Sequence, residues 1–125
     1  MGANNYSKTD VIKFLKSIKI LSIGLTPQVT KALQGAGVDT LYDLCETDYL
    51  KFRTEIRGLG VVGQKEVQAR MGQLGLRFRW NEDSPYVKLF SNELKENCNT
   101  DYEEVNISRI LDLVMRWESE QQKLK

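Results

Sequence analysis

The stretch Glu55–Leu76, EIRGLGVVGQKEVQARMGQLGL, decides the fold. A Gly-Leu-Gly turn opens a segment in which Val67, Met71 and Leu74 are spaced by four and three residues, which is typical of one face of a helix. Glycines permit a tight turn between two helices. The stretch therefore predicts a helix, a hairpin and a second helix.

The same turn leaves backbone N–H groups uncovered where the second helix begins. The first N–H groups of a helix have no partner within it, and the helix dipole adds positive charge at that end. Such donors form a seat for a phosphate oxygen, which makes nucleic acid a candidate ligand. The alternative is that Gly-x-Gly meets only the steric need of a tight turn.

Length and composition limit the class of protein. The 125 residues are enough for one ordinary domain with its own core. No run reaches the roughly 18 apolar residues that cross a bilayer, so we expect no membrane contact. The start, MGANNYSKTD, lacks the apolar region of a signal peptide, so we expect a cytoplasmic protein.

Two widely separated cysteines, Cys45 and Cys98, and the absence of histidine limit the chemistry. Neither cysteine belongs to a CxxC pair, and histidine is the commonest zinc ligand and the commonest general base. Metal binding and Cys–His or Ser–His–Asp catalysis are therefore disfavoured. We expect no cofactor and no enzymatic activity.

The charge is divided along the chain although the net charge is only +1. Residues 10–80 contain eleven Lys and Arg against seven Asp and Glu, whereas residues 81–125 contain six against ten. A basic first part and an acidic second part suggest different partners for the two. The alternative is that both are solvated helix surfaces.

Helix signals also precede the hairpin. Thr9 or Asp10 is suited to cap a helix that ends near Lys19. Lys13, Lys16 and Lys19 lie on one edge of this helix, where they would follow phosphates or simply face water.

A second helix–turn–helix unit is expected before the glycine hairpin. Thr26 followed by proline indicates a helix over 27–34, because the hydroxyl caps and proline fits the first turn. Another short helix follows, capped by Asp39 or Thr40. With the turn at 58–63, this arrangement predicts a tandem helix–hairpin–helix architecture.

Anchors in a fixed order connect these two units to a known family. They are Leu25-Thr26 opening a helix, Leu33, the run from Gly37 to Leu44, Gly58-Leu59-Gly60, Glu66 and Leu74-Gly75-Leu76. Through them, residues 20–78 resemble the C-terminal domain of the bacterial RNA polymerase alpha subunit. The resemblance implies a compact helical domain with helix–hairpin–helix elements, here followed by an additional C-terminal extension.

The resemblance also implies a function. In that family the domain binds the minor groove of A/T-rich promoter elements and contacts activators and sigma factors. Its DNA-facing arginine, asparagine, lysine and serine correspond to Gln28, Lys31, Val62 and Gly63 in this chain. Glutamine cannot exploit the negative potential of a narrow minor groove as arginine does. The resemblance therefore implies phosphate contact rather than recognition of that family's promoter element.

The residues after the hairpin unit alternate basic and aromatic side chains. Arg77, Phe78, Arg79 and Trp80 would clamp a sugar–phosphate backbone and stack a base. Alternatively, and by preference, the two aromatic rings return to cover the hairpin core while the arginines lie outside.

Two helices are expected in the acidic extension. Ser84-Pro85 begins one that ends near Asn97, and Asn106 or Ser108 caps the last. The last helix carries an apolar stripe, Ile107, Ile110, Leu111, Val114 and Trp117. We expect this helix pair to pack on the hairpin core, the alternative being a homodimer or partner contact.

These observations predict an all-α fold, a tandem helix–hairpin–helix domain with an N-terminal helix and a C-terminal helical pair. We divide the chain into an N-terminal arm and helix at 1–19, the polymerase-like domain at 20–80 and an acidic helical extension at 81–125.

The leading hypothesis is a small DNA-binding or transcription-associated accessory protein, with RNA polymerase or a sigma factor as a further partner. The alternative is a protein-interaction module that binds or mimics a component of the transcription machinery without binding DNA. The predicted nucleic-acid-binding residues are Gln28, Lys31, Arg57, Gly58, Gly60, Val61, Val62, Gly63, Gln64, Lys65, Arg77 and Arg79.

Overall fold

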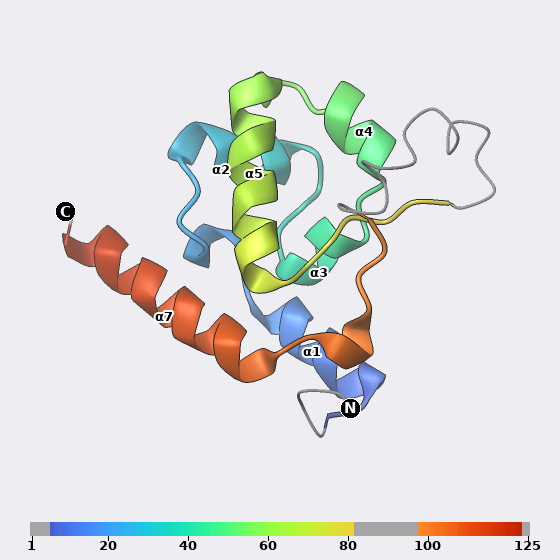
Figure 1. Cartoon of the computed structure of the whole chain (residues 1–125). Coiled ribbons are helices and arrows are strands. Elements are labelled where there is room, and N and C mark those ends of the chain that lie inside the picture. The colour runs from blue at the N-terminus through green and yellow to red at the C-terminus, as the bar shows by residue number, and fades with distance from the viewer. Residues whose placement is uncertain (1–5, 82–97, 124–125) are drawn as a thin grey trace.

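The computed structural model describes residues 6–81 and 98–123, and over these ranges the protein is all-α (Figure 1). The backbone pairings outside helices are isolated bridges, and these ranges contain no strand. The helix expected from Pro85 to Asn97 lies outside the described residues. The helices are α1 (Lys8–Ser17), η1 (Ile20–Ser22), α2 (Pro27–Gly35), α3 (Leu41–Cys45), α4 (Tyr49–Thr54), α5 (Gly60–Leu74), η2 (Tyr102–Glu104) and α7 (Ile107–Lys123). In the described part, every helix is too short or too polar to cross a membrane.

Helix α1 begins earlier than the sequence analysis expected. Ser7, and not Thr9 or Asp10, is the N-cap: its side chain accepts from the Asp10 N–H at 3.2 Å, and the Asp10 carboxylate accepts from the Ser7 N–H at 3.4 Å. The two bonds satisfy donors at the start of the helix reciprocally. The helix ends at Ser17 rather than near Lys19, because Lys19 pairs with Thr40 in an antiparallel bridge.

Helix α2 begins at Pro27 as predicted, but the Thr26 side chain does not cap it. The Thr26 N–H and hydroxyl instead donate to one carboxylate oxygen of Glu66, at 2.8 and 3.2 Å. Glu66 is in the second turn of α5, so this carboxylate ties the start of α2 to α5. The capping prediction for Thr26 is wrong, because its hydroxyl donates to an acceptor forty residues away in the sequence.

Helices α3 and α4 are short and well capped. Thr40 and Asp43 form a second reciprocal cap at the start of α3, so of the two predicted candidates Thr40 is the N-cap. Asp48 caps α4 by accepting from the N–H groups of Leu50 and Lys51. Strong caps stabilise helices that are too short to persist alone.

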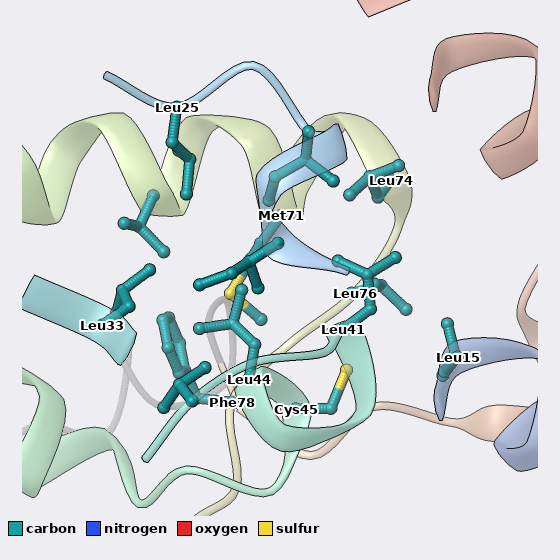
Figure 2. Packing of buried hydrophobic residues seen from close by; sticks show 14 of the residues in the cluster. Leu15, Leu25, Leu33, Leu41, Leu44, Cys45, Met71, Leu74, Leu76 and Phe78 are labelled. Atoms are coloured by element: carbon teal, nitrogen blue, oxygen red, sulfur yellow. The ribbon is translucent and has the colours of Figure 1, made fainter. Parts of the chain in front are cut away.

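One hydrophobic cluster runs through the N-terminal helix, the central helices and the C-terminal extension. Figure 2 shows its centre, where Leu33, Leu44 and Phe78 meet Met71 of α5. The predicted apolar face of α5 is buried along its length. The rings of Phe52 and Phe78 lie 4.2 Å apart between centroids, so the segment after α5 contributes directly to the core.

The segment after α5 is held from two sides. Arg79 forms a parallel bridge with Asp48, and Phe78 forms one with Cys98 of the extension. Phe78 and Trp80 are buried while Arg77 and Arg79 are exposed, which confirms the preferred interpretation of this alternation. The buried Phe78 ring is not accessible for stacking on a base.

Helix α7 packs against α5 and η1 through the side chains of Ile110, Val114 and Trp117. The guanidinium of Arg70 on α5 lies 4.4 Å from the Trp117 ring, a cation–π contact. Packing within the chain is therefore confirmed for this helix. Leu111 was expected in the same stripe but is 42% exposed, since it lies about 100° around the helix from Ile110.

Candidate nucleic-acid interface

The glycine hairpin connects α4 to α5 and stands at the exposed end of α5 (Figure 1). Gly58 and Gly60 have φ values of +80° and +62°, which other residues rarely adopt, so both positions require glycine. Leu59 between them is buried and fixes the turn to the core. The turn is therefore a defined structure rather than a loose connection.

Helix α2 lies directly against this hairpin. A Cβ atom placed on Gly63 would lie 3.1 Å from Leu59 Cδ1 and 3.2 Å from Val29 Cγ2. A Cβ atom on Gly58 would lie 3.8 Å from the Ala32 methyl carbon. These contacts bring the exposed side chains of α2 beside the turn.

No side chain caps the start of α5. Leu59 at the N-cap position has helical φ and ψ values, and its side chain accepts no capping hydrogen bond. In the described parts of the chain, backbone hydrogen bonds outside the helices include none donated by Gly60, Val61 or Val62. All three residues are exposed, and the first N–H groups of a helix have no acceptor within it.

Three exposed cationic side chains lie on the turn, on α5 and on the neighbouring α2. Lys31 comes from α2, Arg57 from the turn and Lys65 from the first half of α5, and all three are exposed. A hollow of about 360 Å³ lies between α2 and the turn, and its lining includes the cationic Lys31 and Arg57, the acidic Glu55 and the apolar side chain of Ile56. The positive ends of these side chains and the α5 dipole act on the same region.

An apolar tip stands on the same hairpin. Val61 is 65% exposed and Val62 is 82% exposed, although valine is a residue that proteins usually bury. The Gln64 side chain points back and donates to the Arg53 carbonyl at 3.0 Å, which holds the end of α4 against α5. Gln64 therefore has a structural contact in addition to its predicted place in the interface.

Three of the predicted residues lie apart from this surface. Gly63 is buried and makes room for Val29, so it supports the hairpin from inside. Arg77 and Arg79 follow the far end of α5, which is about 22 Å from its start. The other nine predicted residues lie on the turn, on the first half of α5 or on α2, which contacts the turn: Gln28, Lys31, Arg57, Gly58, Gly60, Val61, Val62, Gln64 and Lys65.

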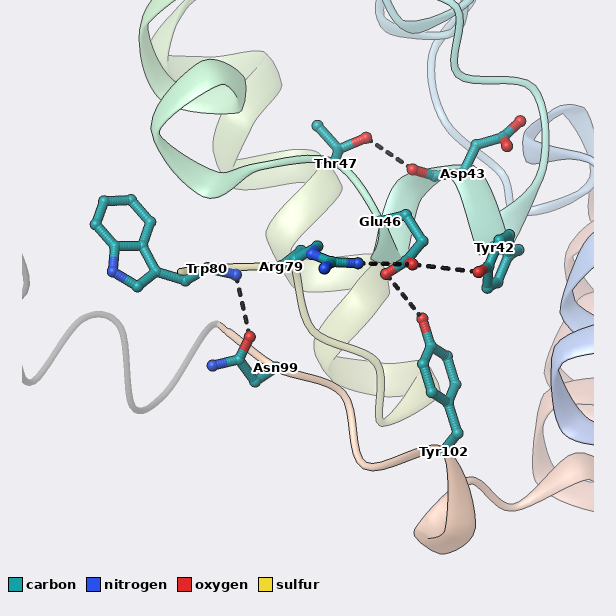
Figure 3. Close-up of polar contacts among 8 residues, drawn as sticks. All are labelled: Tyr42, Asp43, Glu46, Thr47, Arg79, Trp80, Asn99 and Tyr102. Carbon is teal, nitrogen blue, oxygen red and sulfur yellow. Dashed lines mark hydrogen bonds and ion pairs between the residues drawn. The ribbon is translucent and has the colours of Figure 1, made fainter. Parts of the chain in front are cut away.

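Arg79 belongs to a different polar cluster, centred on Glu46 (Figure 3). The Glu46 carboxylate lies 3.1 Å from Arg79 Nη1 and accepts from the hydroxyls of Tyr42 and Tyr102, at 3.2 and 3.4 Å. Burial, the largest cause, raises the pKa of both tyrosines above the ordinary value. The cluster joins α3, the segment after α5 and η2, and no sequence spacing pointed to it.

The Cys45 thiol is unsuited to nucleophilic chemistry. Burial raises the pKa of this thiol to about 12, outweighing the hydrogen bond from Thr100 that lowers it. A thiol with such a pKa is almost wholly protonated near neutral pH, whereas the thiolate is the reactive form. Among the described residues, no group of three or more His, Cys, Asp or Glu side chains is arranged to hold a metal ion.

Comparison of the chain with models of known protein families, with curated proteins and with solved structures finds no match.

Proposed function

We propose that this protein is a small cytoplasmic DNA-binding accessory protein of the transcription machinery. In this proposal the α2–α3 and α4–α5 units are tandem helix–hairpin–helix elements, and the second hairpin grips the phosphate backbone. The observation that carries the proposal is the exposed start of α5 at residues 60–62, which no side chain caps, with exposed cationic side chains on the turn, on α5 and on the neighbouring α2.

The chemistry of this surface suits an anion such as a phosphate. Uncapped N–H groups at a helix start donate to an anion without needing any particular side chain. Lys31, Arg57 and Lys65 approach from separate elements, so they would neutralise phosphates on both sides of the one that the hairpin holds.

The same surface lacks a group suited to reading bases. Gln28 and Val62 occupy positions where the resembling family has an arginine and a lysine. Since phosphate contacts position a protein but carry no sequence information, we expect similar affinity for A/T-rich and G/C-rich duplexes. Binding should also weaken steeply with salt, because each neutralised phosphate releases counterions.

The experiment is a fluorescence anisotropy titration of labelled duplexes at several salt concentrations. Lys31→Ala, Arg57→Ala and Lys65→Ala should each lower affinity for every duplex and reduce the salt slope by about 1. Lys13→Ala, at an exposed position of α1, is the matched control and should leave both quantities unchanged. Absence of binding to any duplex at low salt and high micromolar protein would refute the proposal.

The exposed valines favour a second candidate, a protein-docking surface. Two adjacent apolar side chains on a rigid turn are suited to insert into a pocket of a partner such as an RNA polymerase subunit or a sigma factor. Val62→Lys separates the two candidates. The added cation should strengthen DNA binding under the first, and should abolish nuclease-resistant capture of polymerase subunits under the second.

A further inference from the structure

The outward face of α7 carries apolar and charged side chains that the described residues of the chain leave exposed. Its exposed residues include Ser108, Leu111, Asp112, Met115, Arg116 and Ser119, with Glu118 and Gln122 beside them. Leu111 and Met115 lie in one row along the helix, and Asp112 and Arg116 lie in the next row, with the two members of each row four residues apart. Antiparallel pairing of two copies about a two-fold axis would place the two members of each row beside each other.

The apolar residues of this face are distinctly exposed. Leu111 is 42% exposed and Met115 is 66% exposed, one helical turn apart on the same side. The opposite face of α7 is already buried against α5 and η1. Helix α7 is therefore fixed in place by one face and presents the other to a partner.

The charges select a second copy of this chain as that partner. Asp112 and Arg116 lie four residues apart, and within the described chain neither forms an ion pair. In an antiparallel pair, Asp112 of each copy lies beside Arg116 of the other, so the same contact forms twice. The serines at both ends are small enough to let the helices approach.

We infer that the protein forms a homodimer through antiparallel pairing of α7. The interface centres on Leu111 and Met115 of both copies, with two Asp112–Arg116 pairs beside it. Exposed ion pairs contribute little free energy, so they set register and orientation while the apolar contact supplies most of the affinity. The small contact places the dimer among weak, concentration-dependent ones.

The test is sedimentation equilibrium of the full chain from about 10 µM to about 1 mM. We expect the average mass to rise from the monomer mass of 14.4 kDa toward twice that value. Met115→Glu should remain monomeric over the whole range. Val62→Glu, which places the same charge on a more exposed apolar position of α5, should dimerise like the wild type.

Charge reversal tests the pairing itself. Asp112→Arg and Arg116→Asp should each weaken the dimer at least several-fold, because each places like charges opposite each other. An equimolar mixture of the two variants should recover dimer, since both cross-pairs are then complementary. The inference would be overturned if the wild type stayed monomeric at every concentration or if Met115→Glu dimerised. It would also be overturned if the mixture of the two charge variants dimerised no better than either variant alone.

Discussion

At the scale of single residues, Gly72 and Gly75 show that a glycine can be required by its backbone conformation even where there is room for a side chain. Gly72 and Gly75 both have open surroundings, but only Gly75 has a positive φ, +72°, where it ends the helix. Gly72 is in the last turn of α5, where alanine loses less conformational freedom on folding.

We predict that Gly72→Ala raises the free energy of unfolding by about 0.5–1 kcal/mol. Gly75→Ala should lower it by about 1 kcal/mol, because an L-residue in the left-handed region is strained. Urea denaturation followed by circular dichroism measures both. Equal effects of the two changes would contradict the conformational explanation.

The capping residues show how far local sequence signals reach. Thr40 caps α3 and Pro27 begins α2 as the sequence indicates, because both depend on neighbours within four residues. The predicted N-caps of α2 (Thr26) and of α1 (Thr9 or Asp10, where Ser7 is the cap) were wrong for different reasons. The Thr26 hydroxyl has an acceptor in another helix, and Ser7 competed with equally suitable Thr9 and Asp10 next to it.

At the scale of elements, attachment of α7 depends chiefly on one aromatic side chain. Trp117 is 5% exposed and stacks on Arg70, whose guanidinium also donates to the Gly24 carbonyl at 3.4 Å. The ring therefore connects α7 to both α5 and the turn after η1.

We predict that Trp117→Ala lowers the free energy of unfolding by about 3–5 kcal/mol, because it removes a large buried ring and leaves a cavity. Glu118→Ala, at the adjacent exposed position, should change it by less than about 0.5 kcal/mol. Thermal unfolding at low micromolar concentration gives both values. A small effect of Trp117→Ala would mean that α7 is loosely attached.

The periodicity of apolar residues predicted the helices that carry the hairpin surface. It did not predict the long-range contacts made by the segments that flank these helices. The spacing of Val67, Met71 and Leu74 gives the buried face of α5 because local geometry fixes it. The ion pair between Arg79 and Glu46 joins residues 33 positions apart, and it forms only because the segment after α5 packs beside the end of α3. Contacts of that kind leave no local signature in one sequence.

At the scale of the whole molecule, buried acidic groups predict the response to alkaline pH. The unfolded chain ionises Cys45 near pH 9, whereas burial in the folded chain raises the pKa to about 12. The folded state therefore keeps a proton that the unfolded state releases, and stability falls as pH rises between these values. The raised pKa values of Tyr42 and Tyr102 act in the same direction.

We predict that the free energy of unfolding decreases from pH 9 to pH 12, by at most about 1.4 kcal/mol per pH unit for each proton. Cys45→Ala should reduce this slope even though it also lowers stability at neutral pH. Urea denaturation midpoints at pH 7.5, 9.5 and 11 provide the comparison. Parallel pH profiles for the two proteins would contradict the assignment to Cys45.

The double attachment of the segment after α5 has a practical consequence for labelling. The backbone N–H of Trp80 donates to the Asn99 side chain at 3.0 Å, so two residues nineteen positions apart in the sequence are neighbours in space. A fluorescent protein or affinity tag spliced between residues 81 and 98 would begin and finish at neighbouring anchors. Such a fusion would carry its label without occupying either terminus or the start of α5.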